Sequence, residues 1–163
     1  MILIALGSNL SGPWGSPTET LMSALGELNK MPLRLVKAST LIETQPWGDT
    51  NQPNFVNAVA IIETALSADA LIRKLQMIER QAGRKRRKRW GPRALDLDII
   101  DYKGEIRMLR QAHSKSLTLP HPEIAARNFV LRPIAEIAPR WKHPLTHQTA
   151  QSMIHKLYRL NRI

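Results

Sequence analysis

Apolar and β-branched residues gather in four stretches whose lengths suit buried strands. They are ILIAL at 2–6, LRLVKASTLIET at 33–44, FVNAVAIIET at 55–64 and LDLDII at 95–100. Short apolar runs rich in β-branched residues favour strands over helices. A turn at Lys103-Gly104 and the run EIRML at 105–109 predict that the last strand continues into a hairpin.

Helical patterns lie between these strands and after them. Residues 16–19, Ser-Pro-Thr-Glu, supply an N-cap, a proline at the first helical position and a capping-box glutamate, which predict a helix to about Lys30. Ser67 caps a second helix, in which apolar residues recur every three or four positions, and Gly83 is placed to end it. Residues 134–138 and 149–160 are also predicted to be helical.

The predicted order of elements is strand, helix, strand, strand, helix, strand, followed by a helical C-terminal addition. Two crossover helices and hairpin-like neighbours predict an α+β protein with a ferredoxin-like βαββαβ core. Its sheet is expected to be mixed and mostly antiparallel, with helices packed on it. With 163 residues and no repeat or linker, residues 1–163 are expected to form a single domain.

The composition narrows the choice of compartment and ligand. No apolar run approaches the roughly 18 to 20 residues that span a bilayer, and the N-terminus lacks the charged leader of a signal peptide. We therefore expect a cytoplasmic protein without a membrane partner. The chain has no cysteine, so any metal ion must be held by oxygen or imidazole ligands.

The net charge of +11 is concentrated in two segments. Residues 84–93 carry seven Lys and Arg residues and no acid, and residues 140–163 carry five, whereas the rest of the chain is close to neutral. Such a local cluster suits a phosphate-rich small ligand as well as a polyanion laid across a face. The basic C-terminal segment is expected to be a solubilising surface.

Two aspartates interrupt the strand that follows the first basic segment. Side chains alternate along a strand, so Asp96 and Asp98 should share one face while Leu97 and Ile99 point into the core. Two carboxylates on one face repel, and a divalent cation removes that repulsion. A small set of oxygen ligands suits Mg²⁺, which completes its coordination with waters and phosphate oxygens. A solvated strand face would also explain an Asp-x-Asp pair, and Asp101, of opposite parity, is expected at the surface or in the turn.

Six segments of the chain together resemble one known family. RWGPRALDLDII at 89–100 looks like the signature of the 6-hydroxymethyl-7,8-dihydropterin pyrophosphokinases (HPPK). The other segments follow the family in order: ALGSNL at 5–10, ETQPWG at 43–48, QPNFVNAV at 52–59, IERQAGR at 78–84 and LPHPEIAARNFVL at 119–131. The resemblance implies a folate-biosynthesis enzyme that transfers pyrophosphate from ATP to 6-hydroxymethyl-7,8-dihydropterin, giving AMP and the pterin diphosphate.

The resemblance also implies roles for individual residues. Asp96 and Asp98 would hold two Mg²⁺ ions and, with Arg84 and Arg93, form the catalytic set. The nucleotide site would comprise Gln76, Glu79, Arg86, Arg89, Trp90, Arg93, Ile99, Thr118, His121 and Arg127. The pterin site would comprise Thr44, Gln45, Pro46, Trp47, Phe55, Asn57, Trp90, Asp96 and Phe129, with the two phenylalanines on either side of the ring. ATP and the pterin would be the partners of a monomer that binds no nucleic acid.

Other interpretations of the same residues stay open. Phe55 and Phe129 are also typical of core positions, and His121 is typical of a surface or cap. A basic loop in a βαββαβ order also outlines an RRM-like RNA-binding module, although that module needs aromatic residues on its central strands and ILIALGS has none. A catalytically silent nucleotide-binding relative is the second alternative, and the intact aspartate pair argues against it.

Overall fold

The computed structural model describes residues 1–46, 51–84, 91–107 and 117–160. Its strands are β1 (Ile2–Ser8), β2 (Leu33–Ala38), β3 (Ile42–Thr44), β4 (Phe55–Thr64) and β5 (Asp96–Tyr102). Its helices are α1 (Pro17–Glu27), α2 (Ala68–Gln81), α3 (Asn128–Ile137) and α4 (Ala150–Arg159), with the 3-10 helix η1 (Ile124–Ala126) before α3. The strand predicted at 33–44 is divided into β2 and β3. Within the described ranges, no helix has the length and apolar character needed to cross a membrane.

An antiparallel sheet forms the middle layer of the molecule. Its strand order is β2-β4-β1-β5, and β3 pairs with the beginning of β4. Helix α1 connects β1 to β2 with β4 between them, and α2 connects β4 to β5 with β1 between them. Two crossovers that each skip one strand make the split βαβ arrangement of ferredoxin-like folds, so the predicted α+β class is confirmed.

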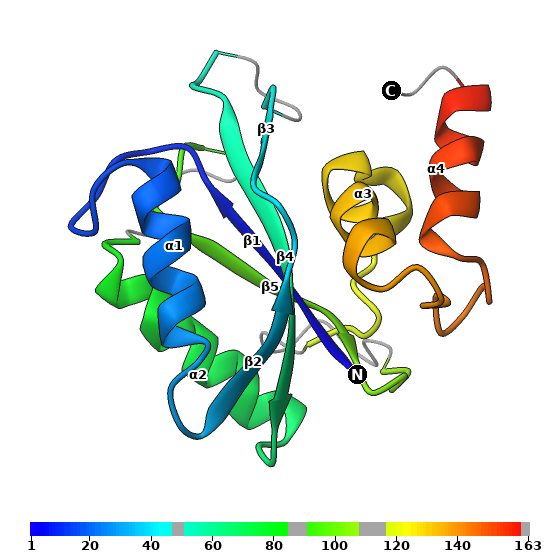
Figure 1. Ribbon diagram of the computed structural model, residues 1–163, viewed down its shortest axis with the longest axis horizontal. Coiled ribbons are helices and arrows are strands. Elements are labelled where there is room, and N and C mark those ends of the chain that lie inside the picture. The colour runs from blue at the N-terminus through cyan, green and yellow to red at the C-terminus, as the bar shows by residue number, and fades with distance from the viewer. Residues whose placement is uncertain (47–50, 85–90, 108–116, 161–163) are drawn as a thin grey trace.

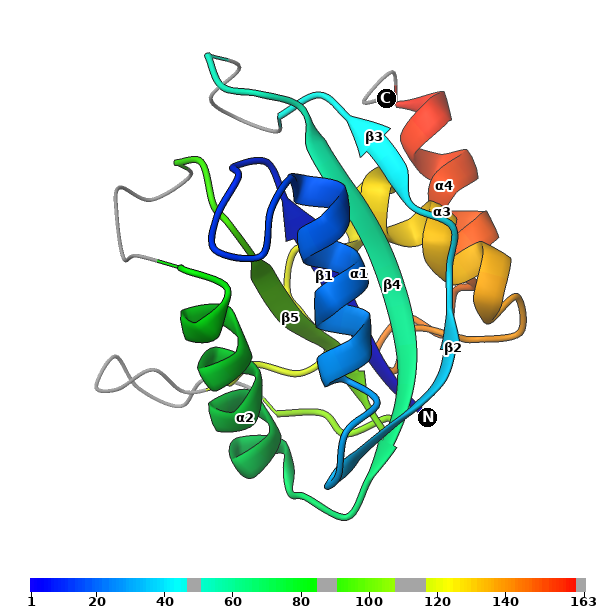
Figure 2. The ribbon, with the colours of Figure 1, turned by 60° about the vertical axis from the view of Figure 1, so that its left-hand side comes forward.

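Helices cover both faces of the sheet. Figures 1 and 2 show α1 and α2 on one face and α3 and α4 on the other. Ile4 of β1 belongs to the buried cluster with Leu71 of α2, whereas its neighbour Leu3 belongs to the cluster with Ile134 of α3. Strand β1 is therefore buried on both sides, which explains why its sequence is a continuous apolar run rather than an alternating one.

The helix boundaries follow the predicted caps. Glu19 Oε2 accepts the backbone N–H of Ser16 at 2.8 Å, and the Ser16 hydroxyl accepts the N–H of Glu19, which completes the capping box of α1. Gly83 follows α2 with a φ of +87°, and a Cβ there would lie 2.4 Å from the Pro13 ring. Glycine at this position therefore allows both the left-handed backbone and the close approach of the segment after β1.

A β-bulge changes the face that the end of β5 presents. The register of β5 against β1 shifts at Ile100, which is the extra residue of the bulge. Asp101 consequently turns toward the side of α3 and α4, where it is 4% exposed and accepts the Trp141 Nε1–H at 2.7 Å and the Gly104 N–H at 2.8 Å. The prediction of a surface position for Asp101 is wrong, because the bulge reverses its parity, whereas its role in the turn is confirmed.

The segment after β5 departs from the predicted hairpin. Lys103 and Gly104 both have positive φ and form the expected turn. Arg107, however, pairs with Leu119 rather than with β5, and its guanidinium donates to both carboxylate oxygens of Asp69 at 2.8 and 2.9 Å. This ion pair ties the segment to the first turn of α2. Residues 108 and 109 of the predicted returning strand lie outside the described residues.

Candidate active site

Asp96 and Asp98 stand at the beginning of β5, the strand at one edge of the sheet. Their backbones lie opposite Gly7 and Ala5 of β1. Leu97 belongs to the core cluster on the α1 and α2 side, so the aspartates face the opposite side of the sheet. The side chains of Asp96 and Asp98 remain 21% and 34% exposed, and both line the same two pockets.

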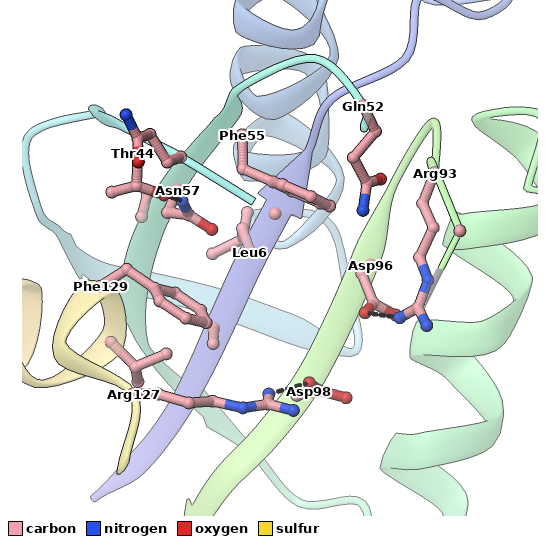
Figure 3. A pocket seen from close by; sticks show the side chains of 16 residues that line it. Leu6, Thr44, Gln52, Phe55, Asn57, Arg93, Asp96, Asp98, Arg127 and Phe129 are labelled. Carbon is pink, nitrogen blue, oxygen red and sulfur yellow. Dashed lines mark hydrogen bonds and ion pairs between the residues drawn. The ribbon is translucent and has the colours of Figure 1, made fainter. Parts of the chain in front are cut away.

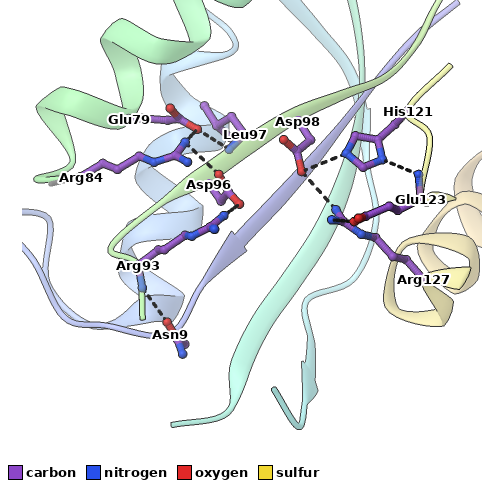
Figure 4. Close-up of polar contacts among 10 residues, drawn as sticks. All are labelled: Asn9, Glu79, Arg84, Arg93, Asp96, Leu97, Asp98, His121, Glu123 and Arg127. Atoms are coloured by element: carbon purple, nitrogen blue, oxygen red, sulfur yellow. Dashed lines mark hydrogen bonds and ion pairs between the residues drawn. The ribbon is translucent and has the colours of Figure 1, made fainter. Parts of the chain in front are cut away.

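Each aspartate has its own cationic partners (Figure 4). Asp96 forms ion pairs with Arg93 and, at 2.8 Å, with Nη1 of Arg84. Asp98 accepts a hydrogen bond from Arg127 at 3.2 Å and lies 3.8 Å from Nε2 of His121. Burial and the negative charge of Asp96 raise the pKa of Asp98. The pair is therefore a concentration of negative charge that surrounding cations offset.

His121 is placed to donate toward this charge in its neutral form. Its Nδ1 accepts the backbone N–H of Glu123 at 3.2 Å, so the neutral ring carries its proton on Nε2, the atom nearest Asp98. Burial lowers the pKa of His121, although the carboxylate of Asp98 opposes that change. The segment is held to the sheet by the His121 N–H, which donates to the Ile100 carbonyl at 3.0 Å.

Glu79 of α2 supports this arrangement from the opposite face of the sheet. It is 4% exposed on α2 and accepts the backbone N–H of Leu97, the residue between the two aspartates, at 2.8 Å. The same oxygen accepts a hydrogen bond from Arg84. Burial raises the pKa of Glu79 to about 7, and the charge of Arg84 opposes part of that rise. Glu79 thus fixes both the strand and the arginine that pairs with Asp96.

The first pocket has aromatic and amide walls (Figure 3). It contains about 730 Å³ of empty space, counting the solvent at its mouth. Phe55 comes from β4 and Phe129 from α3, and Figure 3 shows their side chains on opposite sides of the pocket with Asn57 beside them. Asn57 Nδ2 donates to the Thr44 hydroxyl at 2.8 Å, which leaves the amide oxygen as an acceptor. This pocket suits a flat ring with hydrogen-bonding groups on one edge.

The second pocket adjoins the first and is almost entirely charged. Its lining comprises Arg84, Arg93, Asp96, Asp98, His121, Pro122, Glu123 and Arg127. Four of these residues, Arg93, Asp96, Asp98 and Arg127, also line the first pocket. Guanidinium groups in this number suit a polyphosphate. The two pockets therefore meet at the aspartates, where a group could pass from one ligand to the other.

The oxygen ligands at this junction fit Mg²⁺. Asp96 and Asp98 are partly exposed carboxylates on one strand face, which are the hard ligands that this ion prefers. Among the described residues, no group of three or more His, Cys, Asp or Glu side chains is close enough together to hold a metal ion. A sparse set is compatible with Mg²⁺, because this ion retains waters and shares phosphate ligands.

The structure brings many of the sequence-predicted residues together. Those that line the first pocket are Thr44, Gln45, Phe55, Asn57, Arg93, Asp96, Asp98, Arg127 and Phe129, and those that line the second are Arg84, Arg93, Asp96, Asp98, His121 and Arg127. Pro46, Gln76, Glu79, Ile99 and Thr118 line neither pocket, and Ile99 lies in the core. Trp47, Arg86, Arg89 and Trp90 lie outside the described residues. The assigned ligand contacts of all these residues stay predictions.

Sequence reasoning missed several residues of the site. Gln52 and Gly7 line the first pocket, and Glu123 pairs with Arg127 in the second. A Cβ at Gly7 would lie 3.2 Å from the Asn57 amide oxygen, so glycine keeps that acceptor accessible. The glycine inside an otherwise apolar strand was a recognisable sign of a close approach. The positions of Gln52 and Glu123 depend on long-range packing.

Comparisons with known proteins agree with this geometry. A family model described as 7,8-dihydro-6-hydroxymethylpterin-pyrophosphokinase (HPPK) matches residues 3–139. A 2-amino-4-hydroxy-6-hydroxymethyldihydropteridine pyrophosphokinase of Haemophilus influenzae is 41% identical over 163 residues, which cover 97% of this chain and 96% of the relative. The protein of the same name from Aquifex aeolicus is 36% identical over 144 residues, 88% of this chain and 84% of the relative.

Solved structures share the fold. A crystal structure of Plasmodium falciparum HPPK-DHPS with pteroate superposes with a TM-score of 0.73 at 12% identity. The match covers 99% of this chain and 44% of that longer chain. At this identity the likeness concerns the fold alone.

Proposed function

This chain belongs to the 7,8-dihydro-6-hydroxymethylpterin-pyrophosphokinase family, and from that membership we propose that it transfers pyrophosphate from ATP to 6-hydroxymethyl-7,8-dihydropterin. The products are AMP and the pterin diphosphate, in folate biosynthesis. The observation that carries the proposal is that a pocket walled by Phe55 and Phe129 meets an arginine-lined pocket at Asp96 and Asp98. The RNA-binding and silent alternatives are not favoured, because the named relatives are pyrophosphokinases.

The pterin occupies the first pocket in this proposal. Phe55 and Phe129 stack on the two faces of the ring, and the Asn57 amide oxygen accepts a hydrogen bond from its amino edge. The Thr44 hydroxyl fixes the orientation of that amide. This arrangement directs the hydroxymethyl group toward Asp96, because the aspartate lies at the end of the pocket shared with the second ligand.

ATP places its phosphates in the second pocket. Arg84, Arg93 and Arg127 neutralise phosphate oxygens, and the Nε2–H of His121 adds a neutral donor. The oxygen of the pterin alcohol forms a bond to the β-phosphorus, the bond from that phosphorus to the α–β bridging oxygen breaks, and the alcohol proton is released. Charge neutralisation and alignment of the two ligands supply most of the rate enhancement in such transfers.

Asp96 and Asp98 are the residues that would hold Mg²⁺, for which two ions are proposed. The bound metal would neutralise phosphate charge and polarise the transferred group. The carboxylates would exchange part of their present pairing with Arg84, Arg93 and Arg127 for these ligands, which frees the guanidinium groups for phosphate.

We further propose that residues 1–163 act as one pyrophosphokinase domain, as a cytoplasmic monomer. Helices α3 and α4 share a buried cluster with Leu3 and Val59 of the sheet. The C-terminal helices therefore complete the core that supports Phe129.

The deciding experiment incubates the protein with ATP, Mg²⁺ and 6-hydroxymethyl-7,8-dihydropterin and separates AMP from ADP. AMP and the pterin diphosphate should form in equal amounts. Asp98→Ala should abolish turnover while circular dichroism and the thermal midpoint stay close to those of the parent protein. Asp69→Ala, which removes an exposed carboxylate from an arginine pair outside both pockets, serves as the control and should retain activity. Formation of ADP, or full activity of Asp98→Ala, would contradict the proposal.

A further inference from the structure

A buried amide joins the walls of the two pockets. Asn9 follows β1 directly and is 2% exposed. Its Oδ1 accepts the backbone N–H of Arg93 at 2.8 Å, and its Nδ2 donates to Oε1 of Gln52 and to the carbonyl of Pro53, both at 3.0 Å. Figure 4 shows the amide beside the backbone of Arg93. One side chain thus connects three segments that are far apart in the sequence.

The backbone around Asn9 strengthens the same connection. The N–H groups of Asn9 and Leu10 both donate to the Arg93 carbonyl, at 3.1 and 3.2 Å. The Ser8 hydroxyl donates to the carbonyl of Ala94, the next residue. Both polar backbone groups of Arg93 are therefore held by residues 9 and 10. The direction in which the Arg93 side chain leaves the backbone is fixed, and this side chain pairs with Asp96.

One end of the connection lies in the first pocket only, and the other end lies where the two pockets meet. Gln52 lines the first pocket, whereas Arg93 lines both pockets. A carboxamide is the side chain that suits this place, because it offers an acceptor to an N–H on one side and two donors to carbonyl-type oxygens on the other. Aspartate would lack the donors, and serine is too short to reach both segments.

We propose that Asn9 is a positioning residue. By bonding to both Gln52 and Arg93 it holds the two residues at a fixed distance, so that the pterin alcohol and the β-phosphorus are aligned. The inference rests on the proposed function. Asn9 lines neither pocket, so its effect is expected to pass through Gln52 and Arg93. Loss of the amide should therefore lower the transfer rate more than it weakens the binding of either ligand alone, because small misplacements of reacting groups cost up to about 100-fold in rate.

The test compares Asn9→Ser with the parent protein in three measurements. They are kcat with both substrates saturating, the Kd of the pterin alone and the Kd of a non-hydrolysable ATP analogue alone. We expect kcat to fall by about 10-fold to 100-fold, with each separate Kd changing by less than about 3-fold. Ser39→Ala is the matched control, since its buried hydroxyl links the Val59 N–H to the Thr40 carbonyl away from both pockets. It should lose stability without loss of kcat.

A second variant addresses the connection from its other end. Gln52→Met removes one acceptor of the Asn9 amide and leaves Asn9 and its bonds to Arg93 and Pro53 in place, so a smaller fall in kcat is expected. It provides the measurement if Asn9→Ser does not fold. A kcat for both variants equal to that of Ser39→Ala, or a loss explained by one separate Kd, would overturn the inference.

Failure of the proposed function gives a different pattern from failure of the inference. If the parent protein transfers no pyrophosphate, the function is wrong whatever the variants do. The role of Asn9 is then measured as the factor by which the nucleotide analogue changes the pterin Kd. That factor should be reduced in Asn9→Ser and retained in Ser39→Ala, and an equal factor in both variants contradicts the role.

Discussion

The carboxyl group of Glu79 provides a quantitative test of the buried support beneath the site. It is 4% exposed and accepts hydrogen bonds from the Leu97 N–H and from Arg84. Burial raises its pKa from 4.5 to about 7 despite the neighbouring guanidinium. In the unfolded chain the same group is hydrated and ionises near 4.5.

The sign of the effect on stability follows from proton binding. Between pH 4.5 and about 7, folded Glu79 retains a proton that the unfolded chain has released, so the free energy of unfolding decreases as the pH rises through this interval. The difference in pKa corresponds to about 3 kcal/mol, at about 1.4 kcal/mol for each unit. His121 and His143 act in the opposite direction, because burial lowers their pKa and their contribution to stability is lost as the pH falls.

Glu79→Gln isolates the Glu79 contribution from that of the histidines. Glutamine keeps an acceptor for the Leu97 N–H and cannot ionise. Urea unfolding of both proteins in metal-free buffer should show that the variant gains about 2.5 kcal/mol relative to the parent between pH 5 and pH 8. Glu63→Gln, at an exposed carboxylate paired with Arg34, reports the effect of the same substitution without burial.

A difference between Glu79→Gln and the parent that stays constant within about 0.5 kcal/mol from pH 5 to pH 8 would refute the reasoning. A difference that decreases with rising pH would show that the ion pair with Arg84 outweighs burial. The expected result would mean that the protein retains a destabilising carboxylate, which is reasonable where that group holds Arg84 against Asp96.

Three further substitutions test the pocket, the C-terminal layer and the end of α2. Phe129→Leu should weaken pterin binding about 3-fold to 10-fold in calorimetry and leave ATP-analogue binding unchanged, and equal losses for both ligands would argue against stacking. Trp141→Phe removes the donor to buried Asp101 and should lower the free energy of unfolding, measured in urea, by about 1.5 to 3 kcal/mol. A loss below about 0.5 kcal/mol would show that water replaces the hydrogen bond. Gly83→Ala should lower the thermal midpoint because of its positive φ, while Gly26→Ala, in open space within α1, should raise it, and the reverse order would contradict the backbone argument.

The guanidinium groups that pair with the two aspartates come from two distant parts of the chain. Arg84 and Arg93 are the first and last residues of the basic segment 84–93, and both pair with Asp96. Arg127 approaches Asp98 from the C-terminal half of the chain, with its guanidinium carbon 6.0 Å from the centre of the Phe129 ring. Two arginines that lie near each other in the sequence thus share Asp96, whereas the guanidinium group beside Asp98 comes from a distant segment.

The local patterns of the sequence determined the elements and the chemistry at the aspartates. Caps at Ser16 and Ser67, the glycine at 83 and the alternation of β5 act over a few residues, so they could be recognised without knowledge of the fold. The order of the elements also predicted the ferredoxin-like core, because a crossover helix that skips one strand is a common way to connect it.

Tertiary structure alone decided which groups meet. The bulge at Ile100 reverses the parity of Asp101, and Asn9 reaches Gln52 and Arg93 across 43 and 84 positions in the chain. Neither result can be read from the local pattern of apolar and polar residues, because a bulge and a long-range hydrogen bond both depend on the packing of a neighbouring strand or segment. The sequence by itself thus specified two carboxylates beside a basic segment, and the folded chain supplied the buried groups, Glu79 and Asn9, that hold them in place.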